Sequence, residues 1–241
     1  MGEIVLHLGA HKTASTHLQQ ALKRARPVAG ARILVPDDLR KDGLRLQDWL
    51  HPGVEDAAHE AALRVALAGP GRLVLSEENL LGQVPGAELA ASPTLYPRAA
   101  ERLAKLARLL PPGPVTLALA VREGAGFVAA CYSQALMAGR IRSFRAMFGG
   151  MDPAAPDWDD LAARLLAALP GARLVVWDHA DWPAVAPQVA GVLLGPGAGP
   201  LPLPGGLAHP GLSAEAVARL LAEGGQGPAA AGRARALRAE W

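Results

Sequence analysis

Short apolar runs alternate with amphipathic segments along this 241-residue chain. Wholly apolar runs rich in Val, Ile and Leu predict buried strands, while apolar residues recurring at helical spacing predict helices. Strands are expected over residues 4–8, 32–35, 72–75, 115–121 and 173–177. Helices are expected over residues 15–29, 55–68, 96–110, 126–139, 143–148, 157–169 and 213–223, and a final helix closes the chain. Apolar strands separated by helices are typical of a parallel sheet covered on both faces.

Two stretches lack this periodicity. Residues 37–56 are polar and irregular, and Trp49 with His51 and Pro52 is expected to mark a surface loop. Residues 183–206 are rich in Pro and Gly, and no helix or strand is assigned to them. The length suits one well-buried α/β core, so a single domain over residues 1–241 is expected. In the helix over 55–68, the apolar positions are Ala58, Ala61, Ala62, Val65 and Leu67.

Composition and charge narrow the function classes. Lys and Arg number 24 against 22 Asp and Glu, and no basic block occurs, so nucleic acid is not an expected partner. Cys131 is the only cysteine and is expected to be an inert buried thiol, which excludes an intrachain disulfide. Pro and Gly interrupt every long apolar run, so no transmembrane segment is expected. Without a basic leader before the first strand, a cytoplasmic location is expected. The oligomeric state cannot be inferred.

The first strand runs through Gly9 into the polar loop 11–16 and then into a helix. Such a strand–loop–helix offers free backbone N–H groups and the positive end of a helix dipole, which together favour an anion. Lys12 adds a cation, but the loop does not match G-x-x-x-x-G-K-[ST], because one glycine is missing. The pattern predicts a phosphate or sulfate cradle, or simply a strand followed by a capped helix. The hydroxyl donors would be those of Thr13, Ser15 and Thr16.

Charged residues follow two further predicted strands. Glu77 and Glu78 come after the strand over 72–75, and Arg122 follows the strand over 115–121. In open α/β sheets, ligands bind beyond the carboxyl ends of the strands, so these residues and the loop are expected at one edge. A lysine, a carboxylate and an arginine around one anion suit group transfer. The acids alone would also fit a solvated helix N-terminus, and Arg122 a structural ion pair.

Four blocks of the sequence resemble the sulfotransferases that use 3′-phosphoadenosine 5′-phosphosulfate (PAPS). His11-Lys-Thr-Ala-Ser-Thr-His-Leu-Gln19 is similar to their 5′-phosphosulfate loop, H-K-T-[GA]-[ST]-T-x-x-Q, and Leu75-Ser-Glu-Glu-Asn-Leu80 to their S-x-E segment. Val121 to Gln134 resembles their R-x7-S-x-Y-x-Q segment. Leu207 to Leu221 resembles, more loosely, their C-terminal helix start. The resemblance implies a P-loop-like three-layer α/β/α fold with a parallel sheet of about five strands.

The resemblance also implies roles for the loop and its neighbours. Lys12 would contact the bridging and sulfuryl oxygens, Glu78 would activate the acceptor with Glu77 as the second choice, and Arg122 would bind the 3′-phosphate. One position departs from the pattern: the serine eight residues after that arginine is Ala130 here, and Ser133 is the candidate replacement. The remaining cofactor-binding positions are His11, Thr13, Ala14, Ser15 and Thr16.

The expected function is therefore sulfuryl transfer from PAPS to a hydroxyl, or less readily an amine, of a carbohydrate or small-molecule acceptor. No metal is required, and His7 with His11 does not form the helical pair typical of a zinc site. One alternative is a P-loop kinase or NTPase using ATP and Mg²⁺, for which Asp178 imitates the Walker B aspartate. The other is a catalytically degenerate nucleotide-binding relic, which Ala130 favours.

Overall fold

The computed structural model describes residues 2–27, 30–40, 44–84, 86, 89, 94–206 and 211–239. Contacts within the chain divide it into two compact units. Unit 1 comprises Met1–Gln83, Tyr96–Val121 and Trp158–Gly206, and unit 2 comprises Val84–Leu95, Arg122–Asp157 and Leu207–Trp241. The single domain over residues 1–241 stays a prediction, and the units are described separately.

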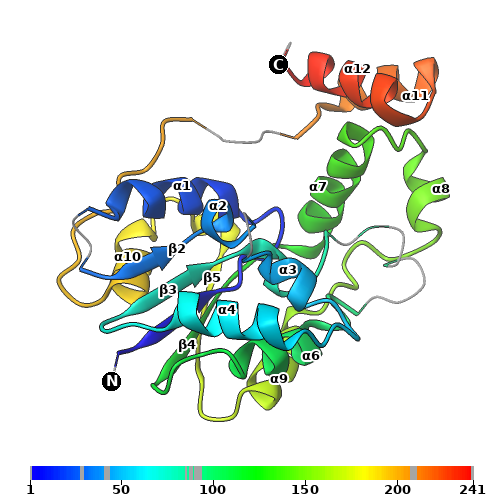
Figure 1. The fold of residues 1–241 in the computed structure, drawn as a ribbon. Helices are drawn as coiled ribbons and strands as arrows, with labels where there is room; N and C mark the ends of the chain where they lie inside the picture. Colours follow the sequence, from blue (N-terminus) through cyan, green and yellow to red (C-terminus); the bar gives the residue numbers. More distant parts are fainter. Residues whose placement is uncertain are drawn as a thin grey trace. The chain divides into compact units, whose positions relative to one another are not determined.

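Unit 1 is built on a five-stranded, wholly parallel sheet in the order β2-β3-β1-β4-β5 (Figure 1). All five predicted strands are present, each within one residue of its expected bounds. His7 at the end of β1 pairs with Ser76 at the end of β3, so the segments that follow these two strands start at the same level. The strands are β1 (Ile4–His7), β2 (Arg32–Leu34), β3 (Leu73–Ser76), β4 (Val115–Val121) and β5 (Arg173–Asp178).

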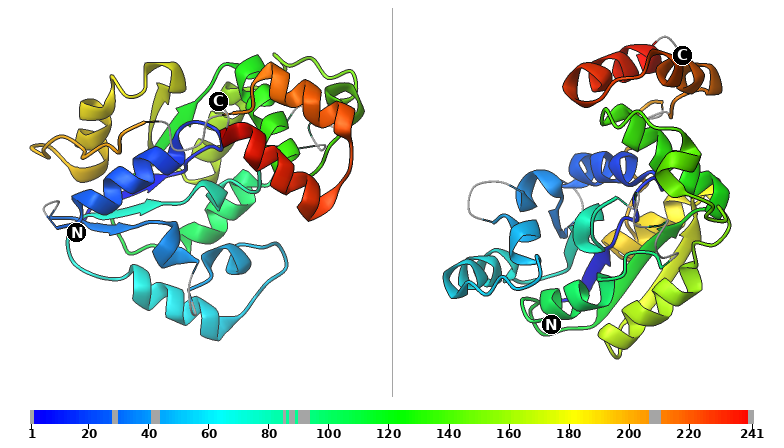
Figure 2. Two further views of the ribbon diagram at one scale, coloured as in Figure 1. Left: turned by 90° about the horizontal axis from the view of Figure 1, so that it is seen from above. Right: turned by 90° about the vertical axis from the view of Figure 1, so that its right-hand side faces the viewer.

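Helices cover both faces of this sheet, which confirms the three-layer α/β/α fold class. On one face, α1 (Ser15–Ala25) and α10 (Ala186–Leu194) pack on the sheet through an apolar cluster. On the other face lie α6 (Ala99–Ala107) and α9 (Trp158–Ala168), as Figures 1 and 2 show. The first cluster includes Val5, Ile33, Val74, Ala118, Leu18, Leu22, Val189 and Leu193, all buried.

The irregular stretches contain helices that the sequence pattern did not predict. Helix α10 lies inside 183–206. It can form there although the stretch is rich in proline, because Pro187 occupies the first turn of the helix, where a proline is tolerated. Residues 37–56 include all of the short helix α3 (Leu46–Trp49) and all but the first residue of α2 (Pro36–Leu39). The expectation that Trp49 marks a surface loop was wrong: its side chain is 0% exposed, and the Lys105 ammonium lies 4.5 Å from its ring centre.

Three helices differ in detail from the expectation, and one of them, α6, covers only Ala99–Ala107 of the expected 96–110. Helix α1 ends at Ala25 instead of residue 29: Arg26 still has helical dihedral angles, but Pro27 has no N–H with which to continue the helix. In α4 (Ala57–Leu67), Leu63 and Leu67 are the buried residues, one helical turn apart, while Val65 is 76% exposed. The predicted apolar face of this helix was therefore wrong at Ala58, Ala61, Ala62 and Val65, which are all exposed, and correct only at Leu67.

Unit 2 is a set of helices: α7 (Gly124–Met137), α8 (Phe144–Phe148), α11 (Ala214–Glu223) and α12 (Gly227–Ala239). Tyr132 packs edge-on against Phe144 and Phe148, and Cys131 is buried as expected. The Ser213 hydroxyl caps α11 by accepting a hydrogen bond from the backbone N–H of Ala216 at 3.1 Å. No helix among the described residues of the chain has the length and apolarity needed to span a bilayer.

Candidate functional site

The loop between β1 and α1 has an unusual backbone. Gly9, Lys12 and Ala14 all adopt positive φ angles, of 53°, 65° and 64°. For residues with a Cβ this left-handed conformation costs about 1–2 kcal/mol each, and such strain gathers at functional sites. Ala14 is the N-cap of α1 and offers no side-chain cap. The first N–H groups of the helix therefore point out of the loop without a side-chain acceptor at the cap, as an anion would require.

Two of the three predicted phosphate-binding hydroxyls face inward. Thr13 Oγ1 and Ser15 Oγ both donate to the carbonyl oxygen of Ala10, at 2.5 and 3.0 Å. These bonds tie the loop to itself, so both side chains support the loop shape. The half-buried hydroxyl of Thr16 makes no hydrogen bond within the described part of the chain, which leaves it able to donate.

The loop packs directly on the segment that follows β3. A Cβ placed on Gly9 would lie 3.2 Å from Glu78 Cα and 3.3 Å from both His7 Cε1 and Ser15 Oγ. Only glycine fits there without displacing backbone. The lysine loop and the acidic segment, predicted from separate motifs, are therefore in contact.

His11 is buried at the centre of a hydrogen-bond network. Its backbone N–H donates to Tyr96 Oη at 3.0 Å, its Nδ1 lies 3.1 Å from the same oxygen, and its Nε2 lies 3.1 Å from Asn79 Oδ1. A neutral imidazole with its proton on Nε2 satisfies all three contacts, since Tyr96 can then donate to Nδ1. Burial lowers the pKa of His11 to about 4; Glu78 and Asn79 oppose this shift, while Lys12 and Arg40 add to it. These charges thus surround a neutral histidine.

Glu77 is a structural carboxylate. It is fully buried and forms a two-bond ion pair with Arg40, whose Nε and Nη2 donate to its two oxygens at 2.9 and 2.6 Å. The backbone N–H of Asn79 adds a third bond at 3.1 Å. With both oxygens engaged and no exposed surface, Glu77 has no access to a substrate.

Glu78 is placed differently. Its side chain is 19% exposed and accepts from Gln19 Nε2 at 2.6 Å and from Arg40 Nη2 at 2.8 Å. Burial raises the pKa of Glu78, but these hydrogen bonds from Gln19 and Arg40 outweigh it and hold the pKa below its usual value. Glu78 is therefore an ionised carboxylate that is held in place and still reaches solvent, so that Glu78, unlike Glu77, can contact a ligand.

Arg40 and Tyr96 belong to this site although they lie outside every quoted motif, while Asn79 lies inside the acidic segment, where no role was predicted for it. Arg40 is the C-cap of α2, just after β2, so the rule that placed Glu78 and Lys12 at the carboxyl edge also reaches it. The stretch over 37–56 has no helical or strand periodicity, so the sequence pattern does not place Arg40 at a strand end. Gln19 stood in the quoted loop motif, but nothing in the sequence indicated that it would hold Glu78.

Arg122 is the first residue of unit 2, directly after β4. Its Nε would lie 3.3 Å from a Cβ on Gly126, in the first turn of α7. On the same helix, the hydroxyl of Ser133 accepts a hydrogen bond from the backbone N–H of Leu212 at 2.9 Å. Two of the four resembling blocks therefore meet inside unit 2. Lys12 and Arg122 belong to different units, and the roles of Arg122 and Ser133 toward a 3′-phosphate stay predictions.

His7 is a second buried histidine at this edge. Its Nδ1 lies 2.6 Å from Ser76 Oγ, its ring stacks on Trp177 at 5.9 Å between centres, and its Nε2 has no hydrogen-bond partner among the described residues. Burial lowers the pKa of His7 to about 4 against the opposing charge of Glu78. It is a neutral group that supports the floor of the loop.

Asp178, the residue that imitates a Walker B aspartate, has a local role in the structure. Its carboxylate accepts a hydrogen bond from the backbone N–H of Ala180 at 2.7 Å and caps a short 3₁₀ turn. Within the described ranges, no group of three or more His, Cys, Asp or Glu side chains is placed to hold a metal ion. Comparisons with protein-family models, with curated proteins and with solved structures found no match to this chain.

Proposed function

We propose that this protein is a PAPS-dependent sulfotransferase. The observation that carries the proposal is the contact between two motifs: a strained, uncapped loop bearing Lys12 packs on the segment that bears the ionised, partly exposed Glu78. An anion cradle beside a fixed carboxylate suits transfer of an anionic group to a protic acceptor. The resemblance of the four sequence blocks identifies that group as a sulfuryl group.

In the proposed reaction, the acceptor hydroxyl gives its proton to Glu78 while its oxygen forms a bond to sulfur. The bond between sulfur and the bridging oxygen breaks, and its electron pair stays on the 5′-phosphate of adenosine 3′,5′-bisphosphate. Lys12 and the first N–H groups of α1 stabilise that developing charge. Gln19 and Arg40 hold the carboxylate in position, and the transfer requires no metal.

A cytoplasmic location belongs to the same proposal. The one cysteine, Cys131, is buried and forms no disulfide, as is usual where cellular thiols are kept reduced. The acceptor is proposed to be a carbohydrate or another small molecule with a free hydroxyl.

Calorimetric titration with adenosine 3′,5′-bisphosphate tests the binding half of the proposal. We expect saturable binding that exceeds binding of ATP with Mg²⁺, and at least a tenfold loss of affinity in Lys12→Ala, because a charge-assisted contact contributes about 1.5–3 kcal/mol. Lys23→Ala is the matched control, since Lys23 is exposed and pairs with Asp37 on the surface. Release of the bisphosphate from PAPS in the presence of a panel of sugars and phenols tests the transfer.

The two alternatives predict other results. Preference for ATP with Mg²⁺ would indicate a kinase or NTPase, and binding without transfer by a folded protein would indicate the relic. A Lys12→Ala variant that transfers sulfate at the normal rate would contradict the mechanism.

A further inference from the structure

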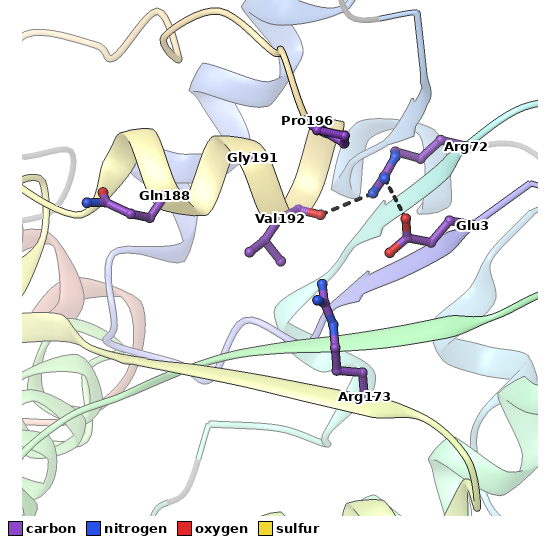
Figure 3. Close-up of a pocket in the computed structure, with 7 residues that line it drawn as sticks. All are labelled: Glu3, Arg72, Arg173, Gln188, Gly191, Val192 and Pro196. Carbon is purple, nitrogen blue, oxygen red and sulfur yellow. Dashed lines mark hydrogen bonds and ion pairs between the residues drawn. The ribbon is translucent and has the colours of Figure 1, made fainter.

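A cavity of about 400 Å³ opens at the amino edge of the sheet, where the strands begin (Figure 3). It lies between the starts of the strands and the C-terminal half of α10, and it belongs wholly to unit 1. Because the loop and Glu78 follow the ends of β1 and β3, this cavity is separate from the site described above. Its volume is within the range of small-molecule pockets.

One wall of the cavity is a fixed ion pair. Arg72, whose side chain is 16% exposed, pairs with Glu3 and donates through Nη1 to the carbonyl oxygen of Val192 at 3.1 Å. The second oxygen of Glu3 accepts from Thr116 Oγ1 at 3.1 Å. The charges of Arg72 and Glu3 cancel, and the carbonyl near the end of α10 is covered by the guanidinium.

Arg173 lies across the cavity from this pair (Figure 3). It is the first residue of β5, and its register partner on β4 is Thr116, so both side chains leave the same face of the sheet. Within the described residues it makes no hydrogen bond or ion pair. The cavity therefore carries one uncompensated positive charge, with a planar donor suited to a carboxylate.

On the remaining side Gln188 is the other polar residue of the lining, and the rest of that wall is apolar and open. A Cβ placed on Gly191, inside α10, would meet no atom within 4 Å, and Val192 and Pro196 line the same side. The absence of a side chain at Gly191 leaves room for the apolar part of a ligand.

We infer that this cavity binds a small organic monocarboxylate: its carboxylate group pairs with Arg173, and its apolar part lies along Gly191, Val192 and Pro196. The single uncompensated charge matches a monoanion, whereas a dianion such as phosphate would keep one of its charges unneutralised in this cavity. The inference is independent of the proposed sulfotransferase activity, because none of these residues belongs to the loop or to the Glu78 network.

Titration of the full chain with acetate, butyrate, hexanoate, benzoate and inorganic phosphate, followed by amide chemical shifts in NMR spectra, tests this inference. We expect saturable shifts around α10 and the start of β5, with hexanoate or benzoate binding at least fivefold more tightly than acetate or phosphate. Arg173→Gln should weaken binding at least tenfold, and Gly191→Leu, which fills the cavity, should weaken it as much. Arg98→Gln is the matched control, because Arg98 is exposed on another helix and pairs with Glu101.

The amide spectra also report whether each variant is folded. Absence of saturable binding by all four carboxylates overturns the inference, as does an Arg173→Gln variant that binds like the unsubstituted protein. Phosphate binding as tightly as benzoate would overturn the organic class of ligand.

Discussion

The two edges of the sheet in unit 1 use arginine in opposite ways. At the carboxyl edge, Arg40 donates three hydrogen bonds to Glu77 and Glu78. It thereby neutralises the Glu77 carboxylate, which has no exposed surface. At the amino edge, Arg173 makes no such bond within the described residues and faces a cavity. This difference distinguishes charged side chains that stabilise the fold from charged side chains that can still bind a ligand. By this criterion Glu77 and Arg40 are structural, while Glu78 and Arg173 can act on a ligand.

Removing each arginine tests that separation most directly. Arg40→Ala leaves Glu77 buried without its counter-charge, and we expect the free energy of unfolding to fall by about 3 kcal/mol. Arg173→Ala should change it by less than about 0.5 kcal/mol, as for other exposed side chains. Urea unfolding of both variants measures this.

The double variant Arg40→Met with Glu77→Gln is the control, since it removes both charges together. It should recover most of the stability lost in Arg40→Ala. Equal effects of Arg40→Ala and Arg173→Ala would remove the distinction between the two edges.

The carboxyl edge should also make stability depend on pH. The pKa of His7 is about 4 in the folded chain and 6.5 when unfolded, so the unfolded state binds more protons between these values. Stability is therefore complete above pH 6.5 and is lost as the pH falls toward 4. From pH 7 to pH 5, His7 alone should lower the free energy of unfolding by about 2 kcal/mol.

Urea unfolding at both pH values measures this change, and His7→Gln should reduce it by about the same amount. His51→Gln serves as the control, because His51 is exposed. A pH dependence that is unchanged in His7→Gln would show that His7 does not stay neutral in the folded chain.

Glycines at the two edges give the smallest expected contrast. Gly9→Ala forces a Cβ into a left-handed residue 3.2 Å from Glu78 Cα, and it should destabilise by at least about 1–2 kcal/mol. Gly191→Ala enters open space inside α10 and should stabilise by about 0.5–1 kcal/mol, because alanine is the better helix former. Thermal unfolding measures both shifts, and shifts of the same sign would contradict the assigned surroundings of the two glycines.

The sheet could be predicted from the sequence because each strand contains an apolar run rich in Val, Ile and Leu, and polar or Gly/Pro signals separate each strand from the next. Helix α10 could not, since a proline and a glycine in nine residues give the composition of a loop, whereas in the fold its buried residues pack in the apolar cluster that includes Val5 and Val74. Trp49 was misplaced for a related reason: its burial depends on Lys105, more than fifty residues away.

In the candidate site, the motifs identified the loop and the acidic segment. They did not indicate which of their side chains are accessible to a ligand and which are engaged in contacts within the fold. Whether Glu77 or Glu78 is accessible depends on Arg40 and Gln19, which come from different elements. Likewise, the inward turn of Thr13 and Ser15 follows from the position of one carbonyl oxygen, that of Ala10. Such side-chain directions are set by tertiary contacts that local patterns do not encode.

The carbonyl oxygen of Ala10 also affects the rate at which an anion should bind to the loop. Because Ala10 already accepts two hydroxyl bonds, the loop holds its shape through its own contacts and has little left to order when an anion arrives. An anion should therefore associate in a single fast step without a slower closing phase of the loop, and most differences in affinity among loop variants should appear in the dissociation rate.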